Sequence, residues 1–70
     1  MITYIVYADY ETGERIGTPS FQIEKILENG INDITLKIEV GLHFAGEDDL
    51  KIYLSNIFKI RIFQINIDLL

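Results

Sequence analysis

The segment Ala45–Asn56, with the sequence AGEDDLKIYLSN, decides between two folds for this chain of 70 residues. As a hairpin, the acidic run Glu47–Asp49 is the loop, and apolar residues at every second position from Leu50 onward form a strand. As a helix over about residues 48–57, Asp48 caps the first turn and an apolar stripe follows. We favour the strand, because Ile, Tyr, Ser and Asn are poor helix formers and the helix would be short.

The residues at the N-terminus predict a strand and a turn. Ile2–Tyr10 is rich in Tyr, Ile and Val and has apolar residues on both faces, which favours a central position in a sheet. Glu11–Glu14 contains a glycine suited to a turn, and Arg15–Gly17 would form a short return strand. This part of the chain therefore predicts a hairpin.

A helix is predicted next, over residues 18–29. Thr18 can cap its first turn, and Pro19 suits the first helical position because its missing N–H has no partner there. Ile23, Ile26 and their neighbours make an apolar stripe, and Gly30 follows the expected end of the helix.

Two more alternating stretches predict strands. Asn32–Phe44 alternates apolar and polar side chains, which indicates a strand with one side in water. Phe58–Ile62 also alternates, but the phase changes at Phe63 and the alternation then continues to Ile67. Such a slip predicts either a bulge or a strand whose apolar side changes face.

These elements predict an α+β fold with a small, mainly antiparallel sheet of four to five strands and one helix packed on one face. The expected order is ββαβββ, or ββαβαβ with a second helix at about 48–57. The length suits a single domain over residues 1–70, and a domain this small buries only about 60% of its unfolded surface. Because the chain has no cysteine, its extra stability must come from apolar packing or from a partner chain.

The charge is negative overall and unevenly distributed. Residues 1–50 hold ten acids and three bases, residues 51–70 hold one acid and three bases, and the net charge is -5. An acidic body disfavours direct binding to nucleic acid, where contacts with phosphate supply most of the affinity. The N-terminus lacks a basic region before an apolar run, and no uncharged stretch approaches the length of a membrane span, so we expect a cytoplasmic protein.

Residue types that support catalysis are scarce. There is no cysteine, the single histidine His43 falls on the polar side of its predicted strand, and the serines lack a glycine-flanked nucleophile turn. The glycine spacing fits no phosphate-binding loop, and Glu47–Asp49 lacks the alternating acids of a calcium loop. The sequence therefore predicts a protein that is not an enzyme and needs no metal or cofactor.

Surplus apolar surface favours a protein-binding module that self-associates as a homodimer. One helix covers only one face of a sheet, so apolar residues near the C-terminus are left for a second copy. The candidate self-association residues are Phe58, Ile60, Ile62, Phe63, Ile65 and Ile67.

A tiny acidic chain rich in Ile and Asn, without catalytic residues, also has the general profile of phage or mobile-element inhibitors of host enzymes. Proteins of this kind include anti-CRISPR and anti-restriction inhibitors, some of which place acids where DNA phosphates would lie. The candidate partner-binding residues are Tyr10, Glu11, Glu14, Glu47, Asp48 and Asp49. The alternative is a nucleic-acid-binding protein that uses its basic residues, which are Lys37, Lys51, Lys59 and Arg61.

Overall fold

The predicted α+β fold is confirmed by the computed structural model, which describes residues 1–11 and 20–70. These residues form one α-helix and a four-stranded, mostly antiparallel sheet. The elements in chain order are β1 (Ile2–Asp9), β2 (Gln22–Glu28), β3 (Asn32–Asp33), the 3-10 turn η1 (Thr35–Lys37), α2 (Glu47–Phe58), the 3-10 turn η2 (Ile62–Gln64) and β4 (Ile65–Leu69).

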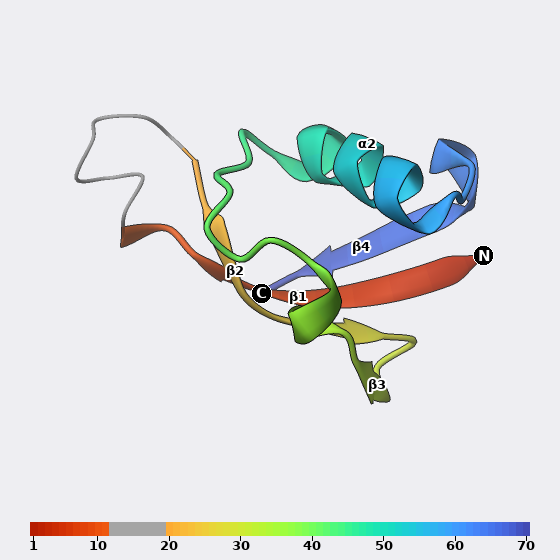
Figure 1. The fold of residues 1–70 in the computed structure, drawn as a ribbon, viewed down its shortest axis with the longest axis horizontal. Coiled ribbons are helices and arrows are strands. Elements are labelled where there is room, and N and C mark those ends of the chain that lie inside the picture. Colours follow the sequence, from red (N-terminus) through yellow and green to blue (C-terminus); the bar gives the residue numbers. More distant parts are fainter. Residues whose placement is uncertain (12–19) are drawn as a thin grey trace.

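β1 occupies the middle of the sheet, as predicted, because the strands lie in the spatial order β3-β2-β1-β4 (Figure 1). β1 runs antiparallel to β2 and parallel to β4, so Tyr4 lies between Glu28 on one side and Ile67 on the other. A strand with neighbours on both sides uses apolar residues on both faces, which explains its composition.

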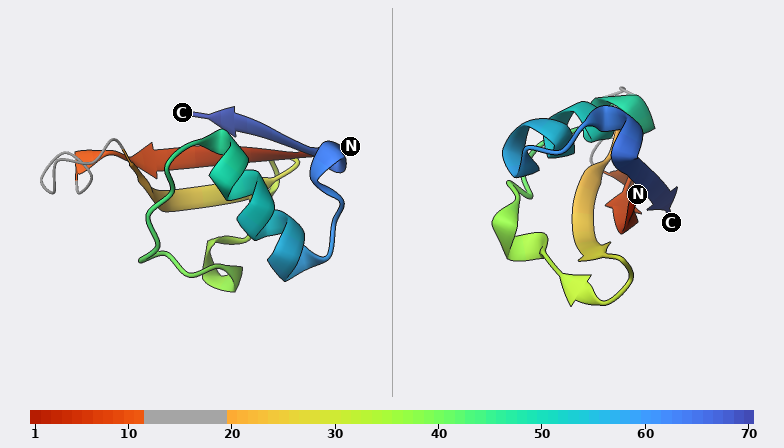
Figure 2. Two further views of the ribbon diagram at one scale, coloured as in Figure 1. Left: turned by 90° about the horizontal axis from the view of Figure 1, so that it is seen from above. Right: turned by 90° about the vertical axis from the view of Figure 1, so that its right-hand side faces the viewer.

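One face of the sheet packs against α2 (Figure 2). Tyr4, Val6 and Ile26 on the sheet and Leu50 and Leu54 on the helix have no measurable solvent exposure. Together with nearby apolar side chains they form one core, which confirms the prediction of a helix on a single face.

The helix predicted over residues 18–29 is wrong where the structure describes it, because β2 occupies that stretch. Ile23 and Ile26 suggested a helical stripe because they are three positions apart. In the structure the register of β1 against β2 shifts, and Glu24 is the extra residue of a β-bulge. The bulge places Ile23 and Ile26 on the same buried face of a strand.

Asn29 and Gly30 form the turn between β2 and β3 rather than the end of a helix. Both have positive φ, 53° and 73°, and the Ile31 N–H donates to the Glu28 carbonyl at 3.1 Å. This geometry is typical of a type I′ hairpin turn. A β-carbon at Gly30 would lie 3.2 Å from Cδ1 of Ile5, so space as well as φ favours glycine.

The long strand predicted over residues 32–44 is also wrong, since only its first two residues belong to a strand. The Asp33 carboxylate accepts hydrogen bonds from the Thr35 N–H at 2.9 Å and the Thr35 hydroxyl at 2.6 Å. Such local bonds turn the chain out of the sheet and into η1. The alternation therefore does not define one face, and Leu36 is fully exposed while Phe44 is buried.

Residues 47–58 form α2, so the favoured strand is wrong and the helical alternative is confirmed. Leu50 and Leu54 are its buried residues, and their contacts with the sheet outweigh the weak helix propensity of the segment. The three acids of its first turn suit the positive end of the helix dipole. Lys59 ends the helix in the left-handed conformation, with φ 57°.

The strand predicted from Phe58 to Ile62 is wrong, because Phe58 ends α2 and Ile62 begins η2. The change of phase at Phe63 marks this 3-10 turn, and the second alternation is β4. The return strand predicted at residues 15–17, the helix start at Thr18 and most of the preceding turn lie outside the described residues. None of the helices in the described part combines the length and the apolar character that a bilayer crossing requires.

Candidate functional site

One edge of the sheet is formed by β4, and in the described part of the chain no strand lies on its outer side. The Leu70 N–H donates to the Val6 carbonyl at 2.8 Å, and the Ala8 N–H donates to the Leu70 carbonyl at 3.1 Å. Because these groups alternate in direction along a strand, Ile67 and Leu69 direct theirs away from β1. β4 therefore offers backbone donors and acceptors to a further strand.

The opposite edge of the sheet is covered by the chain itself. The Ile26 N–H donates to the Thr35 hydroxyl at 3.1 Å, and the Ile26 carbonyl accepts from the Ile34 N–H at 3.0 Å. Phe21 and Phe44 exchange backbone hydrogen bonds of 3.0 and 2.8 Å. Folded proteins commonly cover an edge in this way to prevent unwanted pairing, so β4 is the edge that remains open to a partner.

Exposed apolar side chains lie where β4 begins. Ile62 and Phe63 in η2 have 47% and 70% of their surface exposed, and Met1 has 86%. Ile2 and Ile65 are neighbours across β1 and β4, which brings the N-terminus to the same end of the sheet as η2 (Figure 2). The open edge is thus flanked by apolar surface.

The six predicted self-association residues fall into three groups. Ile62 and Phe63 are exposed. Phe58 and Ile60 are partly buried against the core, and the Phe58 ring stacks on Tyr4 with 6.2 Å between centroids. Ile65 and Ile67 are 3% and 8% exposed, so their side chains serve the core and only their backbone is open to a partner.

The predicted acidic residues that the structure describes lie toward one end of the molecule. The Tyr10 ring is 5.5 Å from the ring of Phe21, which pairs with Phe44 just before α2 begins. Tyr10 and Glu11 therefore lie at the end of the sheet that faces the acidic first turn of α2. Glu14 is outside the described residues.

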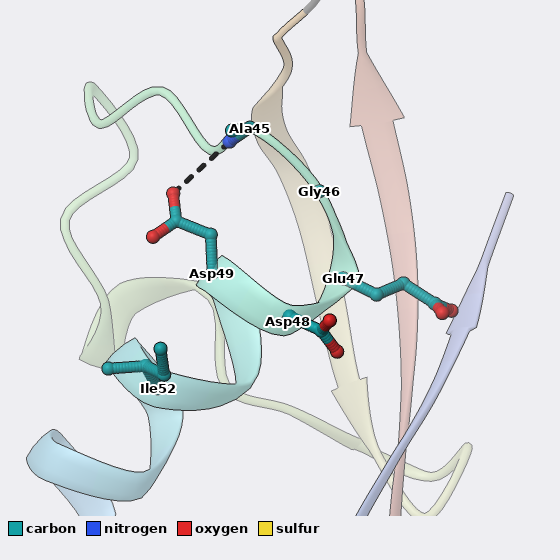
Figure 3. A pocket seen from close by; sticks show the side chains of 6 residues that line it. All are labelled: Ala45, Gly46, Glu47, Asp48, Asp49 and Ile52. Carbon is teal, nitrogen blue, oxygen red and sulfur yellow. Dashed lines mark hydrogen bonds between the residues drawn. The ribbon is translucent and has the colours of Figure 1, made fainter.

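The first turn of α2 borders an open hollow of about 640 Å³, and its acids spread apart there (Figure 3). The Asp49 carboxylate turns back to accept the Ala45 N–H at 3.1 Å, whereas the Glu47 and Asp48 side chains point in other directions (Figure 3). Among residues 1–11 and 20–70, no three His, Cys, Asp or Glu side chains could hold a metal ion. The acids thus form a charged surface and do not converge on one point.

The basic residues are divided among several elements. Lys59 and Arg61 lie between α2 and η2, at the end of the helix opposite its acids. Lys51 lies within α2, and Lys37 lies in η1, which contacts β2. A 12-residue helix is about 18 Å long, so the acidic and basic ends of this molecule are well separated.

Two side chains have shifted pKa values, and neither belongs to a catalytic pair. Burial raises the pKa of the Tyr4 phenol, and the negative charge of Glu28 adds to the effect. The hydrogen bonds from Thr35 lower the pKa of the Asp33 carboxyl, with help from Lys25. Both groups shape the fold.

Sequence reasoning missed the open backbone edge of β4, because alternation reveals which side chains share a face but not which strands become neighbours. The one available signal was the phase change at Phe63, which separates η2 from β4. No protein-family model matches the chain, and no curated protein or solved structure matches it at a significant level. The functional argument therefore rests on the residues described above.

Proposed function

We propose that this chain is a non-enzymatic, cytoplasmic protein-binding module that self-associates as a homodimer through β4 and η2. The observation that carries the proposal is an uncovered strand edge flanked by the exposed side chains of Ile62 and Phe63. Edges of this kind recruit a further strand, since the backbone supplies hydrogen bonds and nearby apolar side chains supply buried area. Burying one large apolar side chain contributes about 1.5–3 kcal/mol.

The test compares oligomeric states by light scattering at low micromolar concentration. We expect the unmodified chain to have twice its mass of 8.1 kDa and the double variant Ile62→Ser, Phe63→Ser to shift toward the monomer. Leu36→Ser is the matched control, because Leu36 is equally exposed but lies in η1, on the far side of β2. A monomeric unmodified chain, or equal effects of the η2 and η1 variants, would contradict the proposal.

A second role is supported by the acidic end, where Tyr10 and Glu11 face the acidic first turn of α2. We propose that this end binds a basic, nucleic-acid-binding surface of a host enzyme, as a small phage or mobile-element inhibitor of the anti-CRISPR or anti-restriction type would. The test is inhibition of DNA binding across a panel of purified bacterial nucleases. We expect Asp48→Lys to abolish inhibition and Glu39→Lys, an equal change of charge elsewhere, to retain it. Inhibition unaffected by either variant would remove the acidic end from the proposal.

Direct nucleic-acid binding is the alternative, and it is less favoured. Lys37, Lys51 and Arg61 lie on separate parts of the structure, and the net charge is -5. Nucleic-acid binding depends on neutralising phosphates. We therefore expect no gel shift with single- or double-stranded DNA at low salt. A shift that disappears in Lys59→Ala, Arg61→Ala would reverse this order of preference.

A further inference from the structure

We propose that the second copy docks on β4 in an antiparallel direction and in one register, with Ile67 opposite Ile67 of the second copy. This inference rests on the proposed self-association and specifies its geometry. A closed dimer with two-fold symmetry uses the same surface on both copies. When that surface is the edge of one strand, the two strands run antiparallel.

The directions of the backbone groups favour this register. Ile67 directs both its N–H and its carbonyl outward, because Leu70 directs both toward β1. A residue opposite its own copy in an antiparallel ladder exchanges both bonds. The Leu69 N–H then meets the Ile65 carbonyl of the other copy. The Ile65 N–H already donates to the Ile62 carbonyl, so it needs no partner.

The exposed side chains favour the same register. On the face of the sheet away from α2, Asn66 falls opposite Asp68 of the second copy, and its amide can donate to that carboxylate. A register centred on Asp68 places two carboxylates opposite each other, which is destabilising. A register centred on Asn66 leaves the outward N–H of Leu69 without a strand partner.

Charge at the two ends of the molecule supports the antiparallel direction. Lys59 and Arg61 precede β4, whereas the acidic first turn of α2 lies toward the opposite end. An antiparallel dimer places the basic end of each copy alongside the acidic end of the other. The Glu47 side chain extends from α2 in the direction of β4 in the view of Figure 3, and it is the acid closest to that edge there. Complementary charges of this kind orient partners more than they add affinity.

Cysteine cross-linking tests the register, and the described chain contains no cysteine that would interfere. Opposite residues in a non-hydrogen-bonded antiparallel pair have β-carbons about 4.5–5.5 Å apart, close to the spacing that a disulfide needs. We expect an equimolar mixture of Asn66→Cys and Asp68→Cys to form a mixed disulfide-linked dimer, and each variant alone to form none.

The possible results separate the register from the proposed function. Self-linking of Asn66→Cys alone, or of Asp68→Cys alone, would overturn the register while leaving the β4 dimer in place. A dimer of twice 8.1 kDa with no cross-link in any sample would overturn the use of the β4 edge. A monomeric unmodified chain would overturn both proposals.

A charge swap gives an independent readout. Asn66→Asp places like charges opposite each other at two symmetric positions, and we expect the dimer dissociation constant to rise by roughly tenfold. Adding Asp68→Asn restores amide–carboxylate pairs with the original net charge, so we expect recovery of most of the lost affinity. A double variant as weak as Asn66→Asp would contradict the predicted pairing.

Discussion

Replacing Tyr4 with phenylalanine is expected to stabilise the fold. The Tyr4 side chain has no measurable exposure, and its hydroxyl has no hydrogen-bond partner. Phenylalanine keeps the ring and its stacking on Phe58, where the planes differ by 14°. The substitution therefore removes a buried polar atom and retains the apolar contacts.

The size of the gain follows from the cost of that atom. Leaving a buried hydroxyl unpaired costs about 1–3 kcal/mol. Removing the oxygen leaves a small void that recovers part of this cost for the original residue, so we expect a net gain of about 1 kcal/mol. For a domain of this size, 1 kcal/mol corresponds to a rise in Tm of about 4–8 °C.

Urea unfolding at one fixed protein concentration measures the change, since dimerisation links stability to concentration. Tyr7→Phe is the matched control, because Tyr7 is 38% exposed on the other face of β1 and its loss should stay within about 0.5 kcal/mol. If Tyr4→Phe unfolds at lower urea than the unmodified chain, the hydroxyl makes a favourable contact and the reasoning about the core is refuted.

The pH dependence of Tyr4 has a definite sign. Burial raises the pKa of the folded phenol above its ordinary value of 10.0. Between the unfolded and folded pKa values the unfolded chain binds fewer protons, so stability is complete below about pH 10 and falls above it. The slope from this one group is at most about 1.4 kcal/mol per pH unit. We expect Tyr4→Phe to flatten this alkaline loss, and an unchanged slope would contradict the assignment.

The other predictions concern η1, the core and the β2–β3 turn. Thr35→Val removes both hydrogen bonds to Asp33, so we expect the lowered pKa of that carboxyl to return toward its ordinary value in an NMR titration. The same variant is expected to lose less stability than the unmodified chain as the pH falls below about 4, since a lowered pKa stabilises only above that range. Leu54→Ala creates a cavity beneath α2 and is expected to cost about 2–5 kcal/mol in urea unfolding; a cost below 1 kcal/mol would contradict its place in the core. Gly30→Ala strains a position with φ 73° and crowds Ile5, so we expect a loss of about 1 kcal/mol or more, and no loss would contradict the turn geometry.

Local composition was enough to predict the fold class and the central strand, but not the positions of the other elements. β1 combines β-branched and aromatic residues with apolar surface on both faces, and these properties do not depend on distant contacts. The assignment of β2 failed because a bulge at Glu24 gives a strand the spacing of a helix. The assignment of α2 failed because its stability comes from burying Leu50 and Leu54 against the sheet, which propensity does not measure.

The candidate site was partly foreseeable from the sequence. Ile62 and Phe63 were selected for their apolar character, and the structure places both on the surface beside β4. Ile65 and Ile67 were selected for the same reason but are buried, because the chain turns at η2 and changes which face it presents. The direction of a strand's backbone groups depends on its neighbour, so the open edge could be recognised only once β1 and β4 were paired.

Amide hydrogen exchange along β4, followed by NMR at low and high protein concentration, tests the central claim most directly. The Ile67 and Leu69 N–H groups point away from β1, whereas the Leu70 N–H is bonded to Val6 at 2.8 Å. We predict that exchange at Ile67 and Leu69 slows as the concentration rises and that Leu70 is protected throughout. Rapid exchange at Ile67 and Leu69 at every concentration would show that no second copy pairs with this edge.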